Sequence, residues 1–120
     1  MKKEQEIAKE FIKILDDKKV EDISCIMISE ALPIADYFII GTVQSSHQVS
    51  AIVKEAEDLA RKFNFRIINR HATEQNGWFL LDFDIVIIHL FTPEMREYYQ
   101  LENLWKKYAV NKESLEPLKH

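Results

Sequence analysis

The pattern in this sequence that most resembles an enzyme's is the pair of carboxylates in Asp82-Phe83-Asp84. Two carboxylates with one residue between them can project from a strand edge toward a divalent metal, as nucleotidyl-transferring enzymes require. Those enzymes carry a Gly-Ser at a helix start shortly before the pair, whereas here Gly41 and Ser45 precede it by another helix and strand, and no third acid is evident. Aspartate is also a common turn residue. A structural turn is therefore the stronger interpretation and metal catalysis the weaker one.

The histidines and the single cysteine do not complete a catalytic or metal site. Metal-binding histidines recur at characteristic short spacings, which His47, His71, His89 and His120 do not show. His89 is the one that we place on a strand facing a tryptophan, where it could bind a partner or move a proton, although a hydrogen-bonded structural role is commoner. Cys25 lies in a short apolar run, as inert cysteines do. We predict no catalytic residue, no metal and no cofactor.

Charge and glycine content exclude further classes. Sixteen Lys and Arg against twenty Asp and Glu give a net charge of −4, which is the wrong sign for nucleic-acid binding through bulk electrostatics. With two glycines in the chain, phosphate loops and serine nucleophile elbows are excluded, and an anion site at Gly41 to Ser46 is only weakly indicated. No run approaches the roughly 20 apolar residues of a membrane span. We expect a cytoplasmic protein with no membrane or sequence-specific nucleic-acid partner.

Apolar periodicity predicts the elements that position these residues. One helix runs from Ile7 to near Asp17, a second begins at the capping box Ser45 to Gln48, and a third begins at Thr92-Pro93. β-branched runs predict five strands, at 23–28, 36–43, 65–68, 78–82 and 85–90. The prediction is a single α/β domain over residues 1–108, with a mixed sheet of about five strands flanked by helices and a parallel crossover from 36–43 to 65–68. The weakly patterned tail, 109–120, is predicted to be disordered.

The last two strands form a predicted hairpin whose two faces differ. With a two-residue turn at Phe83-Asp84, Trp78 lies opposite His89, Leu80 opposite Ile87 and Asp82 opposite Ile85. The apolar face is predicted to be core and consists of Phe79, Leu81, Val86, Ile88 and Leu90. The mixed face consists of Trp78, Leu80, Asp82, Ile85, Ile87 and His89. Because Tyr and Trp contribute much of the binding energy at interfaces, this face and the aromatic helix after it favour an interaction surface over an active site.

Four segments carry a family resemblance: Ala35 to Ile40, Thr42 to Ser46, Trp78 to Phe91, and Arg96 to Trp105. They contain a Trp-x-Leu-Leu-Asp strand, a His-Leu-Phe strand end and a closing Tyr-x-Leu-Glu-x-Leu-Trp. In these motifs the chain resembles the ribosomal silencing factor, or Iojap-like, family, from the first helix to Trp105.

The resemblance implies a nucleotidyltransferase-like topology without enzymatic activity. Members of that family bind the large ribosomal subunit at ribosomal protein L-fourteen and keep the small subunit from joining, which represses translation under nutrient limitation. An acidic protein suits such a basic partner. The residues expected to bind the ribosomal protein are Trp78, Leu80, Asp82, Ile87, His89, Tyr98, Tyr99, Glu102 and Trp105. The alternatives are a metal-dependent nucleotidyltransferase using Asp82 and Asp84, and a homodimer whose mixed face is buried against a second copy.

The sequence departs from the family pattern at three positions where glycine is usual. Val43, Ala72 after His71, and Asp84 stand there instead. Since glycine adopts positive φ without steric cost, these losses predict loops with a different backbone.

Overall fold

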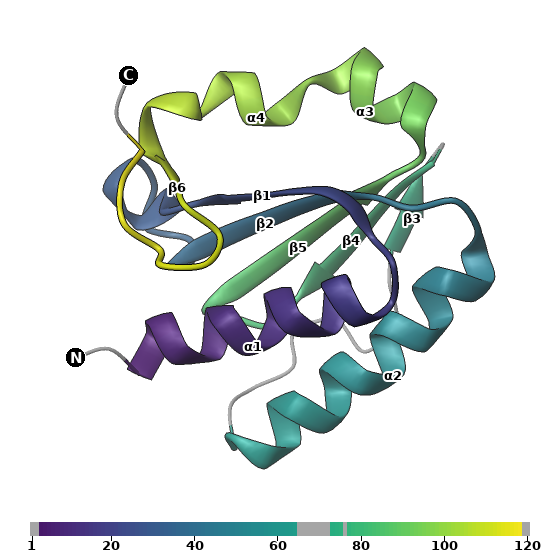
Figure 1. Cartoon of the computed structure of the whole chain (residues 1–120), viewed down its shortest axis with the longest axis horizontal. Coiled ribbons are helices and arrows are strands. Elements are labelled where there is room, and N and C mark those ends of the chain that lie inside the picture. Colours follow the sequence, from purple (N-terminus) through teal and green to yellow (C-terminus); the bar gives the residue numbers. More distant parts are fainter. Residues whose placement is uncertain (1–2, 65–72, 76, 119–120) are drawn as a thin grey trace.

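The computed structural model describes residues 3–64, 73–75 and 77–118, which form one mixed sheet with helices on both faces (Figure 1). Helices α1 (Lys3–Asp17) and α2 (Ser46–Lys62) cover one face, and α3 (Pro93–Tyr99) with α4 (Leu101–Leu104) covers the other. The strands in chain order are β1 Glu21–Ile26, β2 Tyr37–Thr42, β3 Thr73–Gln75, β4 Trp78–Asp82, β5 Val86–Phe91 and β6 Ala109–Val110. The predicted α/β class with a mixed sheet is confirmed.

The sheet has the strand order β3-β4-β5-β2-β1-β6, in which β2 and β5 run parallel and the other neighbours antiparallel. Every residue of β2 and β5 is buried, as expected for central strands covered on both faces. The predicted strand at 65–68 lies outside the described residues, and so does the predicted crossover to it. Among the described residues of this chain, none belongs to a helix long and apolar enough to cross a membrane.

The sheet separates two apolar clusters. The first lies under α1 and α2 and includes Phe11, Leu15, Ile52, Leu81 and Phe83. The second lies under α3 and α4, with six buried side chains: Ile26, Ile28, Phe38, Ile40, Ile87 and Phe91. Trp78, Leu80, Met95, Leu101 and Trp105 pack against this second cluster.

Both helix starts read from the sequence are confirmed. Ser45 Oγ accepts a hydrogen bond from the Gln48 N–H at 3.2 Å, while the Gln48 side chain accepts one from the Gln44 N–H at 2.7 Å. The reciprocal bond of this capping box therefore goes to the residue before the cap. Thr92 Oγ1 accepts from the Met95 N–H at 3.4 Å, and Pro93 takes the first helical position.

The predicted register of the β4–β5 hairpin is wrong by two residues. The observed pairs are Trp78 with Phe91, Leu80 with His89, and Asp82 with Ile87. The turn still has two residues but lies one residue later, at Asp84 and Ile85: the Phe83 N–H donates to the Val86 carbonyl, and Asp84 has the left-handed φ, 74°, that the first position of such a turn requires. A shift of two residues keeps each side chain on its face, so the two-face prediction holds within the strands.

The prediction of a disordered tail is wrong for residues 109–118. Ala109 and Val110 pair with Ile26 and Cys25 and form a strand that was not predicted, as is β3 at Thr73–Gln75, which lies in a polar run that the sequence indicated as a loop. Val110 and Leu115 are buried in the first cluster. A two-residue strand and a single buried leucine have no periodicity, which is why the sequence pattern missed them.

Candidate functional site

The mixed face of the β4–β5 hairpin lies under α3 and α4. Ile87 is buried and His89 is 5% exposed, whereas Trp78, Leu80 and Asp82 are half-buried. The central strand residues of the predicted binding surface, Ile87 and His89, therefore belong to the core. Met95, Leu101 and Trp105 cover it from the same chain, so no second copy is needed to bury this face.

An aromatic ladder leads from this covered face to the surface. Its members are Phe91, Trp78, Tyr99 and Tyr98. The rings of Trp78, Phe91 and Tyr99 contact one another in a triangle, with centroid distances of 5.0 Å for Trp78–Phe91, 4.7 Å for Trp78–Tyr99 and 5.9 Å for Phe91–Tyr99, and Tyr98 meets Tyr99 edge-on at 5.1 Å. Exposure rises along it, because Tyr99 is 38% and Tyr98 75% exposed. The inner rings therefore fix the position of an aromatic group that faces solvent.

His89 has a structural role in this ladder. The Trp78 indole N–H donates to His89 Nδ1 at 3.2 Å, and the His89 ring meets the Phe38 ring edge-on at 4.5 Å. His89 Nε2 is buried with no hydrogen-bond partner among the described residues. Burial lowers the pKa of His89 to about 4, so the imidazole is neutral near pH 7 and holds the indole in place.

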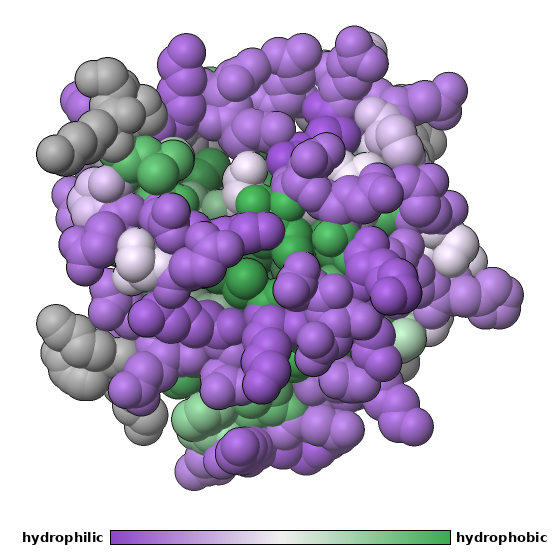
Figure 2. Space-filling model, in the orientation of Figure 1, coloured by the Kyte–Doolittle hydropathy of each residue, from purple (hydrophilic) through white to green (hydrophobic). Residues whose placement is uncertain are grey.

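Five of the exposed side chains of α3 and α4 form what we call the α3–α4 surface: Glu94, Glu97, Tyr98, Tyr99 and Leu104. Leu104 is 69% exposed. The face in Figure 2 is mostly hydrophilic, including the upper part where α3 and α4 lie, and its hydrophobic residues gather mainly along the middle, over the sheet. Exposed aromatic groups beside acidic ones make the α3–α4 surface a candidate protein-binding site.

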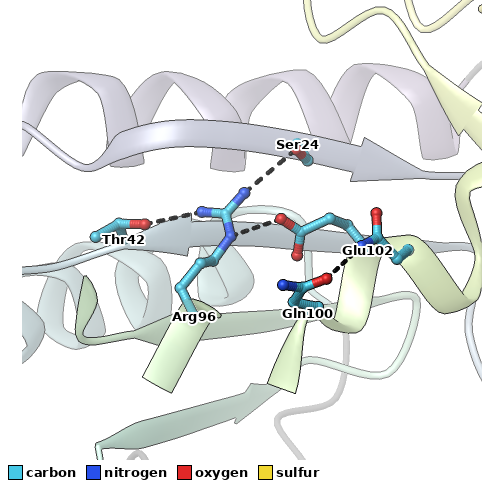
Figure 3. A network of polar contacts seen from close by, with 6 residues as sticks. Ser24, Thr42, Arg96, Gln100 and Glu102 are labelled. Carbon is cyan, nitrogen blue, oxygen red and sulfur yellow. Dashed lines mark hydrogen bonds and ion pairs between the residues drawn. The ribbon is translucent and has the colours of Figure 1, made fainter. Parts of the chain in front are cut away.

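Helices α3 and α4 contain a group of polar contacts around Arg96, which we call the clasp and which the sequence did not predict. Arg96 donates from Nε to Glu102 Oε2 at 2.9 Å, from Nη1 to Thr42 Oγ1 at 2.9 Å and from Nη2 to Ser24 Oγ at 3.4 Å (Figure 3). Glu102, expected to contact a partner, thus points inward to Arg96. Trp105 is half-buried against the second cluster. The one sequence feature that could have indicated these contacts is Arg96 itself, a single arginine among the acidic residues of α3.

A cavity of about 400 Å³ opens beside this clasp, between the ends of β1 and β2 and the two upper helices. Its lining is polar and mainly acidic, with Glu21, Asp22, Glu97 and Glu102 against Arg96.

Asp82 and Asp84 form a turn, at the opposite end of β4 from Trp78. Asp82 Oδ1 accepts the Asp84 backbone N–H at 3.0 Å, the side-chain bond typical of aspartate in turns. No three His, Cys, Asp or Glu side chains of the described residues come together as a possible metal site. The arrangement supports the structural interpretation of the pair.

Two of the three lost glycines can be placed. Val43 is fully buried in the first cluster without a left-handed φ, so its side chain extends the core. Asp84 keeps the left-handed backbone despite its side chain, which contradicts the predicted change of backbone there. Ala72 lies outside the described residues, as do His71 and His120. Cys25 is buried, and burial raises the pKa of its thiol to about 12, consistent with the predicted inert role.

Restoring glycine at the turn should stabilise the fold. We expect Asp84→Gly to raise the free energy of unfolding by about 0.5 to 1 kcal/mol, because glycine adopts positive φ without a Cβ clash. The Asp82 bond is kept because it uses the backbone N–H. Urea unfolding at pH 7 measures the change, with Asp84→Ala as the control that should destabilise. Equal destabilisation by both substitutions would show that the Asp84 carboxylate, and not the backbone angle, decides stability.

Taken together, these features define a single α/β domain whose acidic pair lies in a turn, whose Arg96 and Glu102 form an internal clasp and whose exposed tyrosines lie on one helical surface. A family model described as "Ribosomal silencing factor during starvation" matches residues 1–120, and the chain belongs to that family.

Relatives and solved structures agree with this assignment. Ribosomal silencing factor RsfS of Halalkalibacterium halodurans is 35% identical over 101 residues, covering 84% of this chain and 86% of the relative. The RsfS of Bacillus subtilis is 36% identical over 90 residues, covering 75% and 76%. A crystal structure from Chromobacterium violaceum superposes with a TM-score of 0.74 at 29% identity, covering 85% of each chain. One from Bacillus halodurans gives 0.72 at 30%, covering 89% of this chain and 98% of that one. The predicted family and fold are confirmed.

Proposed function

We propose that this protein represses translation by binding the large ribosomal subunit through ribosomal protein L-fourteen and sterically blocking the small subunit. Family membership supports a role at the ribosome, since the bacterial relatives are named ribosomal silencing factors. A mouse relative, 29% identical over 97 residues that cover 78% of this chain and 42% of the relative, is named for mitochondrial assembly of the ribosomal large subunit. We further propose that the protein acts in the cytoplasm and has no catalytic activity.

The observation that carries the proposal is the aromatic ladder that ends on the α3–α4 surface. Tyr99 is held by Trp78 and Phe91, so little side-chain freedom remains to be lost on binding. Fixed, partly exposed aromatic groups are typical anchors of protein interfaces. Glu94 and Glu97 on the same helix suit a basic ribosomal protein. Steric blocking of the small subunit requires that the protein bind the large subunit and occupy space there, and it requires no catalytic step.

In this proposal the residues expected from the sequence divide by role. Tyr98 and Tyr99 contact the partner, and Leu104 joins them as a residue that the sequence reading did not select. Trp78, Leu80, Ile87, His89 and Trp105 support them from the second cluster. Asp82 lies in the turn at the far end of β4 and takes no part in the contact.

A subunit-joining experiment tests the function. Purified large and small subunits are mixed with increasing amounts of the protein and separated on a sucrose gradient. We expect joined ribosomes to fall and the protein to travel with the large subunit alone. An unrelated acidic protein of similar size serves as the control. Unchanged joining at saturating protein, together with no recovery of ribosomal protein L-fourteen in a pull-down, would contradict the proposal.

A further inference from the structure

The junction between α3 and α4 is a single residue in a strained conformation. Gln100 has φ 46° and ψ 49°, the left-handed region, which costs a residue other than glycine roughly 1–2 kcal/mol. Its N–H donates to the Arg96 carbonyl at 2.9 Å and closes α3. Helix α4 has four residues, too few to be stable alone. Contacts from outside the junction must therefore hold the angle between the two helices.

Arg96 and Glu102 supply such a contact across the junction. The Arg96 side chain is only 12% exposed, and its three nitrogens bond to α4, β2 and β1. The planar guanidinium fixes these three directions at once, which a lysine ammonium on a flexible stem does not. Glu102 uses Oε2 for Arg96, and its buried Oε1 has no partner among the described residues. The pair therefore ties α4 to α3 and both to the sheet (Figure 3).

This clasp also decides which way the tyrosines face. At 100° per residue, Tyr98 lies about 200° round α3 from Arg96, on the opposite side of the helix. With Arg96 drawn toward Thr42 and Ser24, Tyr98 must point to solvent, and it is the most exposed large hydrophobic side chain of the described residues. Tyr99 also lies on α3, so its direction depends on how Arg96 holds this helix against the sheet, together with the contacts of its ring with Trp78 and Phe91.

We propose that Arg96 and Glu102 are positioning residues of the binding surface: Arg96 holds α3, with Tyr98 and Tyr99, against the sheet, and the ion pair holds the α3–α4 angle that places Leu104 relative to them. This inference rests on the proposed function, because it concerns the same surface. It reassigns Glu102 from partner contact to internal support. Arg96 acts through the tyrosines and touches no partner.

The paired replacement Arg96→Met with Glu102→Leu separates positioning from stability. Removing both charges leaves no uncompensated buried ion, and such replacements are often neutral or stabilising. We expect a melting temperature near the wild type's but affinity for the large subunit lower by about tenfold or more, since preorganisation is lost. Amide hydrogen exchange at Gln100, Asn103 and Trp105, whose N–H groups bond within this segment, should become faster in the free protein.

The matched control is Arg61→Met with Asp58→Leu, which removes an exposed ion pair between an arginine and a carboxylate on α2. It should leave affinity and the exchange of these amides unchanged. If the clasp double variant does not fold, Thr42→Val removes one of the three Arg96 contacts and should weaken binding by a few fold.

The outcomes distinguish the two proposals. A wild-type protein that fails to bind the large subunit contradicts the proposed function itself. A wild type that binds, with a folded clasp variant of equal affinity and unchanged amide exchange, overturns the positioning role while leaving the function intact.

Discussion

Replacing Tyr99 with alanine should weaken binding to the large ribosomal subunit by about 30-fold or more, the effect of losing roughly 2 kcal/mol at an interface hot spot. Tyr99 is the point where the aromatic ladder reaches the surface, fixed by Trp78 at 4.7 Å and Phe91 at 5.9 Å. Its loss removes both the contact and the rigid support of Tyr98. Co-sedimentation across a concentration series of large subunits measures the change.

Tyr98→Ala separates contact from folding in the same assay. Because the Tyr98 side chain is largely exposed, its removal should leave the free energy of unfolding nearly unchanged while still reducing affinity. Ile34→Ala is the control, since Ile34 is another exposed hydrophobic residue, in the loop before β2. Wild-type affinity in both tyrosine variants would place the binding site elsewhere on the protein.

Acidification should destabilise the fold through His89. Burial lowers the pKa of His89 from 6.5 to about 4 in the folded protein. Between pH 6.5 and pH 4 the imidazole is therefore protonated in the unfolded chain but neutral in the folded one. The stability linked to His89 is therefore complete above pH 6.5 and is lost as the pH falls toward 4. A difference of about 2.5 pKa units corresponds to about 3 kcal/mol.

The measurement compares urea unfolding of the wild type and His89→Phe at pH 7 and pH 4. We expect the wild type to lose about 3 kcal/mol more than the variant between these pH values. Carboxylates also titrate in this range, and the pKa of Asp36 is raised by burial and by the charges of Glu4 and Asp84, an effect of opposite sign. These contributions cancel in the comparison because both proteins share them. Equal losses in both proteins would contradict the assignment to His89.

The features that the sequence predicted are those with local causes. The helix starts at Ser45 and Thr92 follow from side chains that bond to nearby N–H groups, and the apolar face of the hairpin follows from strict alternation. The central strand Tyr37–Thr42 was visible as a continuous apolar run.

What the sequence could not predict depends on distant contacts or on one backbone angle. The hairpin register differs because the turn forms at Asp84 and Ile85, with Asp84 at positive φ, and not at Phe83 and Asp84. Ile87 and His89 lie on the mixed face of the hairpin, where apolar and polar side chains occur together. Both residues are buried only because α3 and α4 return over this face. Arg96 reaches Thr42 and Ser24 on strands far away in the chain, a relation that spacing alone does not reveal.

The parallel pairing of β2 with β5 has a consequence for how the protein folds. The β1–β2 and β4–β5 pairs are antiparallel between neighbours in the chain and can form early, whereas Tyr37 must find Val86 across α2 and β3–β4. Closing so long a loop costs entropy before any contact compensates it, which slows folding. We therefore expect substitutions in the β2–β5 contact to slow refolding more than equally destabilising ones in α3, which refolding kinetics after dilution from urea would measure.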